Sequence, residues 1–582
     1  MKEQRFPGLG VSPGVAFGIA HVRESGVVDI PEYEIRKKDV KTEEDRLVRA
    51  VRLAQRQVRR LQSRAKEMAN EAGEELWALL DAYLLMLDGS RLVRGAEKRI
   101  GAQRINAEAA IQMEIAVISE AFQAMDDTYI AARLDDIREV GNRILLNLGK
   151  HPLRPLSALP KGSIVIAENL SPADMAQLDP STVVGVGTLL GGAEGHTAIV
   201  ARALGIPSVL GATDLIEGVH TGDRVIIDGS AGLIVVNPGP DTLKRLERRR
   251  AELDKASKRL ARLKSQPAIS RDGTVFKLQA NIELPIEMKM IGHVAAEGVG
   301  LLRSEFMFMN RPTVPTEDEQ FETMRHIVEG MNGYPVTIRT LDVGAEKAAN
   351  AVIGEMDDSV ATALGLRGIR LSLLRPDLLE TQFCAMLRAA NYGPVRILLP
   401  MVTTVSEVQQ ARKILEKAAA RLKRRKVKLP KDLPPLGTMI EVPGAALAAD
   451  ALAQVSDFLA IGSNDLTMYT LAADRANEHV ASLFDPLHPA VLRLIQFTTG
   501  AAMKARIPIS ICGEMAGDPQ LTVLLAGLGL REFSMSPSNI PRVKQRIREM
   551  DAVAASNRAN LIMDQVDSGR IRMLLDDFNG LA

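Results

Sequence analysis

The chain has 582 residues, too many for one hydrophobic core, so we expect two to four domains. Lysine and arginine total 73, aspartate and glutamate total 72, and the net charge of +1 gives no general attraction to nucleic acid or anionic membranes. Aromatic residues make up only 3% of the chain, which argues against the stacking platforms that bind single-stranded nucleic acid.

The two cysteines, Cys384 and Cys512, are too few and too distant for a disulfide framework or a Cys-rich zinc site, which suits a reducing compartment. The N-terminus lacks the long apolar run of a signal peptide, and no segment approaches the ~20 apolar residues of a membrane span. We therefore expect a cytoplasmic protein without membrane insertion.

Two segments of different pattern form the N-terminal part. Residues 1–35 carry glycine, proline and short β-branched runs, which predict strands and turns. Residues 36–149 read as amphipathic helices, since apolar residues recur at spacings of three and four at Leu47, Val51, Ala54, Val58 and Leu61. We expect a helical bundle, inserted into an α/β domain that residues 1–35 share.

That α/β domain continues over residues 150–240, where short apolar runs such as GSIVIA and RVIIDG alternate with Gly-rich turns. Residues 241–268 are highly charged, with Leu246, Leu253 and Leu260 seven residues apart. We interpret this segment as a solvated connecting helix, and a coiled-coil dimer contact is the alternative.

Residues 269–582 repeat strand, loop and helix about eight times, and near-continuous apolar strands predict a parallel sheet covered on both faces. This pattern fits a (β/α)8 TIM barrel, whose active sites lie at the C-terminal ends of the strands. Polar residues fall repeatedly at those predicted ends: Arg303, Ser304, Glu305, Arg339, Asp342, Glu441, Asn464, Asp465, Cys512 and Glu514.

The residue types at these strand ends indicate an anionic substrate. Arg303, Arg339 and Arg475 are suited to clamping an anion bidentately, as arginine does with phosphate and carboxylate. Glu441 and Asp465 offer the hard oxygen ligands that suit Mg²⁺. Cys512 is a candidate acid or nucleophile. A small, dianionic, chelating substrate such as a phosphorylated keto acid fits this set.

A second candidate site lies in the segment GGAEGHTAIVARALGIPSVLG, where His196 follows a Gly-rich turn and opens an apparent helix. The free N–H groups and the dipole of a helix N-terminus favour anions, so an imidazole there is suited to carrying a phosphoryl group. A histidine that only caps the helix is the alternative.

The ordered set of motifs resembles Enzyme I of the bacterial sugar phosphotransferase system, a phosphoenolpyruvate–protein phosphotransferase. The resemblance runs along essentially the whole chain and is carried by VSPGVAFG, HTAIVARALGIPSVLG, AEGVGLLRSEFMFMNRPTVPTEDEQ, TIRTLDVGAEK, GTMIEVPGAAL, IGSNDLTMYTLAADR and ICGEMAGDP. It implies a swivelling phosphohistidine α/β domain with an inserted helical bundle, followed by the barrel.

The resemblance also implies roles for individual residues. His196 aligns with the phosphorylated histidine, and Cys512 with the acid that protonates the enolate carbon to give pyruvate. The others align with groups around phosphoenolpyruvate: phosphate-binding Arg303 and Arg339, the Mg²⁺ ligands Glu441 and Asp465, the phosphate and carboxylate contacts Asn464 and Arg475, and the basic residues Lys347 and Arg367.

By the same resemblance, residues 36–149 dock the phosphocarrier protein HPr, the barrel forms a homodimer, and residues 241–268 are a linker that carries a hinge. The chain departs from the family at three places. Glu194-Gly195 stands where Thr-Ser usually precedes the histidine, Ala345-Glu346 replaces Gly-Asp, and Thr362-Ala363 replaces Asn-Pro. These departures concern rate or carrier choice rather than reaction class.

The sequence has three alternative assignments. Pyruvate phosphate dikinase and phosphoenolpyruvate synthase need a large nucleotide-binding domain before the histidine domain, and only about 150 residues precede it here. A nitrogen-regulatory paralogue normally carries an extra N-terminal sensory domain. A regulatory protein without catalysis would not be expected to keep the histidine, the arginines, the carboxylates and the cysteine together.

Overall fold

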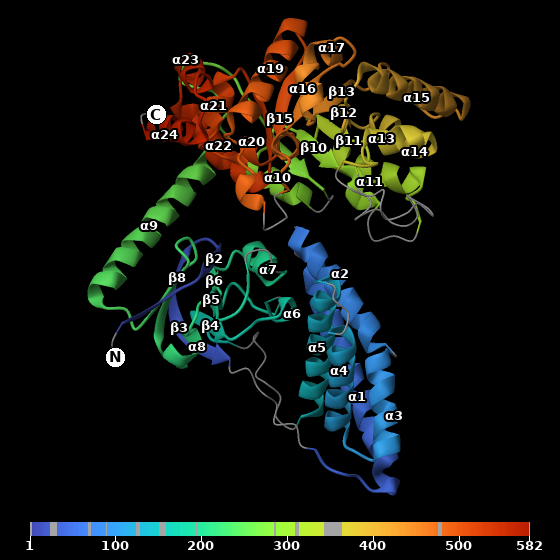
Figure 1. Cartoon of the computed structure of the whole chain (residues 1–582), viewed down its shortest axis with the longest axis vertical. Coiled ribbons are helices and arrows are strands. Elements are labelled where there is room, and N and C mark those ends of the chain that lie inside the picture. Colours follow the sequence, from blue (N-terminus) through green and yellow to red (C-terminus); the bar gives the residue numbers. More distant parts are fainter. Residues whose placement is uncertain are drawn as a thin grey trace. The chain divides into compact units, whose positions relative to one another are not determined.

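The computed structural model describes residues 3–23, 32–67, 71–88, 90–123, 128–149, 159–175, 177–192, 196–283, 287–308, 313–342, 364–474 and 480–580. The chain divides into two compact units, Met1–Ala256 and Ser257–Ala582 (Figure 1). Among the described residues, no helix combines the length and the apolar character needed to cross a bilayer.

The first unit contains an eight-stranded sheet with the order β1-β8-β7-β3-β4-β5-β6-β2. Its strands are β1 (Gln4–Pro7), β2 (Leu9–Ser12), β3 (Val15–Arg23), β4 (Ser163–Ala167), β5 (Val183–Thr188), β6 (Ser208–Leu210), β7 (Arg224–Asp228) and β8 (Leu233–Val236). Strand β3 pairs in parallel with β4 and antiparallel with β7. The N-terminal strands therefore complete this sheet, as the sequence predicts. Its short helices are α6 (Pro172–Met175), α7 (His196–Leu204) and α8 (Leu215–Gly218).

A helical bundle is inserted between β3 and β4 (Figure 1). It consists of α1 (Val40–Glu67), α2 (Glu71–Leu87), α3 (Arg91–Gln103), α4 (Ala107–Gln123) and α5 (Thr128–Leu148). The apolar stripe of α1 is buried, and Leu47 and Val58 have no exposed surface. Arg46 of α1 donates to a Glu43 carboxylate at 2.8 Å and to the Leu148 carbonyl at 2.8 Å. This arginine therefore joins the first helix of the bundle to the end of the last.

Helix α9 (Pro240–Arg262) leaves the sheet of the first unit. Leu246 is buried against Val15 and Val235 of the sheet, and Arg249 forms an ion pair with Asp228 at 3.0 Å. Leu253, one heptad further on, is 40% exposed. The start of the predicted connecting helix is thus packed on the sheet, and its middle is solvated.

The second unit is the predicted barrel. Its eight parallel strands close through the pairing of the last with the first. They are β9 (Lys277–Ile282), β10 (Val299–Arg303), β11 (Val336–Arg339), β12 (Val395–Leu399), β13 (Leu436–Ile440), β14 (Leu459–Gly462), β15 (Ile509–Cys512) and β16 (Glu532–Met535). Nearly every strand residue is buried, because side chains on one face fill the interior and those on the other meet helices.

Helices surround the barrel (Figure 1). The longer ones are α11 (Glu317–Gly330), α14 (Pro376–Ala389), α15 (Val405–Arg424), α19 (Pro489–Ala505), α22 (Ile540–Glu549), α23 (Ala552–Met563) and α24 (Ser568–Gly580). The shorter ones are α10 (Met288–Val294), α13 (Ile369–Leu374), α16 (Pro443–Leu447), α17 (Ala449–Ala453), α18 (Ser463–Leu471), α20 (Glu514–Gly517) and α21 (Thr522–Gly527). Helices α11 and α15 begin with capping boxes, Thr316 with Glu319 and Thr404 with Glu407.

Candidate active site

The predicted barrel residues converge at one face of the sheet. Arg303, Arg339 and Cys512 are the last residues of β10, β11 and β15. Glu441 directly follows β13, and Asp465 lies in the first turn of α18. All these strands are parallel, so their C-terminal ends share a face. A pocket of about 50 Å³ is lined by Leu301, Arg303, Arg339, Met439, Glu441, Gly462, Ser463, Asn464, Asp465, Cys512 and Gly513.

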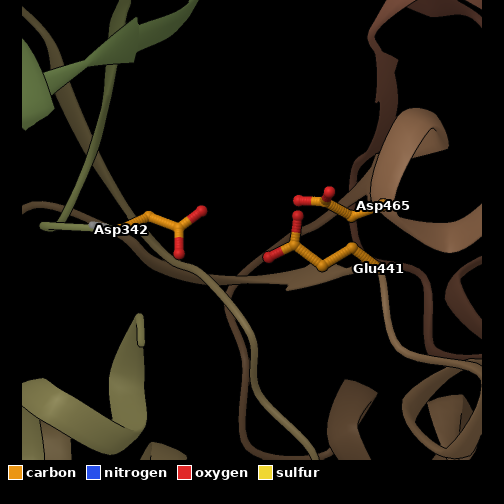
Figure 2. Close-up of side chains that lie close together, drawn as sticks. All are labelled: Asp342, Glu441 and Asp465. Atoms are coloured by element: carbon orange, nitrogen blue, oxygen red, sulfur yellow. The ribbon is translucent and has the colours of Figure 1, made fainter. Parts of the chain in front are cut away.

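Three carboxylates meet at this face: Asp342, Glu441 and Asp465 each offer an oxygen, and these atoms lie within 4.8 Å of one another (Figure 2). Glu441 is 1% exposed, and its Oε1 accepts a hydrogen bond from the Met401 N–H at 2.6 Å. Burial, with the charges of Asp465 and Asp342, raises the pKa of Glu441 to about 8. Three closely spaced carboxylates, two of them buried, favour a bound proton or a cation.

The sequence predicts that Asp342 lies at the end of a strand, but it does not assign this residue to a metal site. It lies three residues after the end of β11, so the same strand-end pattern that selected Glu441 also pointed to it. The structure adds it to the carboxylate group of Glu441 and Asp465.

Two arginines are held against Asp342. Arg339 forms an ion pair through Nη1 with Oδ2 at 3.0 Å, while Arg367 donates through Nε to Oδ1 at 3.1 Å and through Nη2 to Oδ2 at 2.9 Å. Burial alone would raise the pKa of Asp342, but these two guanidinium groups lower it. Arg367 also donates to Asp465 at 3.3 Å and to the Tyr469 hydroxyl at 3.2 Å. The predicted substrate residue Arg367 thus belongs to the same network as the carboxylates.

Arg339 is buried and is also paired on its other edge, where Nε and Nη2 donate to Oε1 of Glu305. Burial would lower the pKa of this arginine, but Glu305 and Asp342 raise it, so the guanidinium stays charged. Arg303 forms an ion pair with Glu283, the residue that follows β9. Sequence reasoning missed Glu283, although it directly follows β9, just as Glu441 directly follows β13.

Carboxylates outnumber guanidinium groups in this network of described residues. It joins Glu283, Glu305, Asp342, Glu441 and Asp465 to Arg303, Arg339 and Arg367. Five formal negative charges face three positive ones, an excess of two negative charges when all are ionised. Binding of an anion here requires protons or a cation that offset this excess.

Cys512 is 4% exposed, and its Sγ donates to the Ile461 carbonyl with a distance of 3.3 Å. Burial raises the pKa of the Cys512 thiol to about 12, with a smaller contribution from Glu441. The thiol is therefore protonated at neutral pH, which suits an acid better than a thiolate nucleophile. The next residue, Gly513, has φ +100°, and a Cβ there would lie 2.4 Å from the Ser463 Oγ. Only glycine fits this turn without displacing Ser463.

Asn464 has a structural contact at the same face, because its Oδ1 accepts a hydrogen bond from the Glu514 N–H at 3.1 Å. Its side chain joins the turns that follow β14 and β15 and also lines the pocket. Lys347 and Arg475, the remaining predicted substrate residues, lie outside the described residues.

The predicted phosphorylation site is in the first unit, where His196 is the first residue of α7. The neighbouring Thr197 donates from Oγ1 to the Leu170 carbonyl at 2.8 Å, which fixes the first turn of the helix. The side chain of His196 is not among those described, and the departures Glu194-Gly195, Ala345-Glu346 and Thr362-Ala363 fall outside the described residues.

Comparisons with known proteins cover nearly the whole chain. Three sequence families match: the PEP-binding domain of PEP-utilising enzymes over residues 257–552, their N-terminal domain over 7–133 and their mobile domain over 159–232. A phosphoenolpyruvate-protein phosphotransferase of Cupriavidus necator is 42% identical over 569 residues, which covers 96% of each chain. The chain belongs to the phosphoenolpyruvate-protein phosphotransferase family.

Further members of this family, from Geobacillus stearothermophilus and Bacillus sp. strain S, are 38% and 37% identical, and each alignment covers 94% of both chains. In terms of the family's domains, the first unit contains the segments matched as N-terminal and mobile domains. The barrel with the carboxylate–arginine network coincides with the segment matched as the PEP-binding domain.

Proposed function

We propose that this protein transfers the phosphoryl group of phosphoenolpyruvate to His196 and then to the phosphocarrier protein HPr, the first step of sugar uptake by the phosphotransferase system. The observation that carries the proposal is the barrel face, where guanidinium groups, a carboxylate cluster and a protonated thiol surround one pocket. Full-length relatives named for this reaction support it.

In this proposal the arginines bind the substrate anion. Arg303 and Arg339 line the pocket and bind the phosphate, Asn464 and Arg475 complete the phosphate and carboxylate contacts, and Lys347 and Arg367 add positive charge nearby. Arg303 reaches the surface, since its side chain is 39% exposed, while Arg339 is buried. One guanidinium group can thus meet an incoming anion at the mouth of the pocket, and the other holds it within.

The carboxylate cluster fits a magnesium ion. Its donors are hard oxygens from Glu441 and Asp465, with Asp342 beside them, and the surplus of negative charge in the network favours a divalent cation. A bound Mg²⁺ would neutralise charge on the phosphoryl oxygens. Glu441 has to give up its proton to bind the ion, and the pKa of about 8 makes that loss accessible near neutral pH.

The proposed reaction moves one phosphoryl group and one proton. The neutral Nε2 of His196 attacks phosphorus, an N–P bond forms, and the P–O bond to the enolate oxygen breaks. The arginines stabilise negative charge on the phosphoryl oxygens while the group is in transfer. The Cys512 thiol supplies a proton to the enolate carbon, which gives pyruvate, and the Cys512 thiolate then takes up a proton from solvent. A thiol with a pKa of about 12 keeps that proton until a strongly basic carbanion-like centre faces it.

Other parts of the chain have proposed supporting roles. We assign residues 1–35 and 150–240 to the phosphohistidine domain, 36–149 to HPr docking, and 269–582 to substrate binding and homodimer formation. Residues 241–268 act as the linker, with its start fixed on the sheet by Leu246 and Arg249. The protein acts in the cytoplasm in this proposal.

One experiment tests the reaction. The full-length protein is mixed with phosphoenolpyruvate, Mg²⁺ and HPr, and pyruvate and phosphorylated HPr are quantified. We expect one pyruvate per phosphorylated carrier, and loss of both products in Arg339→Ala. Pyruvate formation at the wild-type rate in Arg339→Ala would refute the assignment of the pocket. Replacing HPr by its nitrogen-branch paralogue distinguishes the two branches of the family.

A further inference from the structure

Glu305 is a buried carboxylate that the proposed reaction does not use. It lies in the 3-10 turn Ser304–Met307 directly after β10 and is 7% exposed. Glu305 does not line the pocket, whereas Arg339 does, so the carboxylate lies behind the arginine rather than in contact with a bound anion. Glu305 can therefore affect a bound anion only through Arg339.

One oxygen of Glu305 makes all its described contacts. Oε1 accepts from Arg339 Nε at 3.0 Å, from Arg339 Nη2 at 2.7 Å and from the Asp342 N–H at 3.2 Å. The other oxygen, Oε2, is buried and has no hydrogen-bond partner among the described residues. An isolated buried carboxylate oxygen is costly, which indicates that the arrangement is kept for the orientation it imposes on Arg339.

The donors of Arg339 can be counted. A guanidinium has five N–H groups, and here Nε–H and one Nη2–H donate to Glu305, while Nη1 forms an ion pair with Asp342. Nη1 also donates to the sulfur of Met439 at 3.7 Å. The second Nη2–H has no acceptor among the described residues. With both edges held by carboxylates, the guanidinium plane cannot rotate about the side-chain axis without breaking an ion pair.

The backbone that carries the two carboxylates is itself fixed. Gln382 of α14 donates from Nε2 to the Ser304 Oγ at 3.0 Å and accepts from the Leu341 N–H at 2.9 Å. Gln382 is 1% exposed, so these hydrogen bonds are shielded from water. The neighbours of Glu305 and Asp342 along the chain are thereby held in register by one side chain.

We propose that Glu305 is a positioning residue, which fixes the guanidinium of Arg339 so that its free N–H is aimed at the phosphoryl group. This inference rests on the proposed function. Glutamine at position 305 keeps the size of the side chain and removes its charge, while alanine removes the acceptor as well. We expect both changes to weaken the binding of phosphate-bearing ligands through loss of the orientation of Arg339.

The test is a double-mutant cycle on the full-length protein, with the dissociation constant of phosphoglycolate in the presence of Mg²⁺ as the readout. Phosphoglycolate carries a phosphate and a carboxylate but no enol, so no turnover interferes. We expect Glu305→Gln to weaken binding about tenfold in the wild-type background and less than about twofold in the Arg339→Ala background, because the two residues act as one unit. Glu305→Ala should follow the same pattern.

Glu317→Gln is the matched control, since Glu317 of α11 forms ion pairs with Arg388 and Arg425 away from the pocket. It should lower the unfolding temperature of the barrel and leave the dissociation constant unchanged. Equal effects of Glu305→Gln in both backgrounds, or wild-type affinity in Glu305→Gln, would overturn the positioning role. Absence of pyruvate release by the wild-type protein would instead overturn the proposed function.

Discussion

Replacement of Glu441 by glutamine should change how the stability of the barrel depends on pH in metal-free protein. The pKa of Glu441 is raised from 4.5 to about 8, so the folded state holds this proton more tightly than the unfolded state. Such a group contributes stability that is fully present below pH 4.5 and is lost as the pH rises towards 8. Glutamine mimics the protonated form at every pH, so the Glu441→Gln variant does not lose this stability as the pH rises.

The size of the effect follows from the same values. If no other group responded, the change from 4.5 to about 8 would correspond to about 5 kcal/mol, at ~1.4 kcal/mol for each tenfold change in proton affinity. Asp342 and Asp465 lie close enough to share the proton, so part of this free energy is redistributed. We expect the stability of the wild type relative to Glu441→Gln to fall by about 1–3 kcal/mol between pH 5.5 and 8.5.

Unfolding of the barrel is separated from that of the first unit by comparing a signal of the first unit with signals of the whole chain. The sequence has one tryptophan, Trp77 in α2, so its fluorescence reports unfolding of the first unit. Calorimetry and far-ultraviolet circular dichroism in the presence of a chelator report both units. The barrel transition should move with pH in the wild type more than in Glu441→Gln, while the Trp77 transition responds equally in both proteins. If the barrel transition depends on pH to the same extent in the wild type and in Glu441→Gln, the reasoning is refuted.

Three further predictions follow from the same pocket. Added Mg²⁺ at pH 8 should raise the unfolding temperature of the barrel in the wild type, and calorimetry should find little change in Glu441→Gln. Cys512→Ala should keep phosphoglycolate affinity within about twofold but lower the rate of pyruvate release by about 10²-fold or more, and wild-type release would remove the acid role. Gly513→Ala should destabilise the barrel by about 1–3 kcal/mol in denaturant titrations, because a Cβ would lie 2.4 Å from the Ser463 Oγ; unchanged stability would contradict the strain argument.

The barrel and the face that carries the candidate active site could be predicted from the sequence, because the alternation of strands and helices is a local pattern. Short apolar strands alternate with helices, and residues such as Arg339, Glu441 and Cys512 stand where each strand stops. Parallel strands bring those positions together without any knowledge of the loops. The arginines and carboxylates at those positions then indicate that the substrate is an anion that binds together with a metal ion.

The partners of these residues were not predictable in the same way. The sequence places both Glu305 and Asp342 at strand ends. Their ion pairs with Arg339, however, depend on side-chain orientation and on burial. Glu283 escaped notice because its importance lies in an ion pair with Arg303 on the neighbouring strand. The raised pKa of Glu441 likewise arises from burial and from two carboxylates distant in sequence. Such contacts are set by tertiary packing, which local patterns do not encode.

The most direct test of the central claim is identification of the residue that receives the phosphoryl group. The full-length protein is incubated with labelled phosphoenolpyruvate and Mg²⁺, and the modified residue is mapped by mass spectrometry under conditions that preserve phosphohistidine. The label should be acid-labile, base-stable and located on His196, and His196→Ala should carry none. Label that persists in His196→Ala, or that maps to another residue in the wild type, would contradict the account.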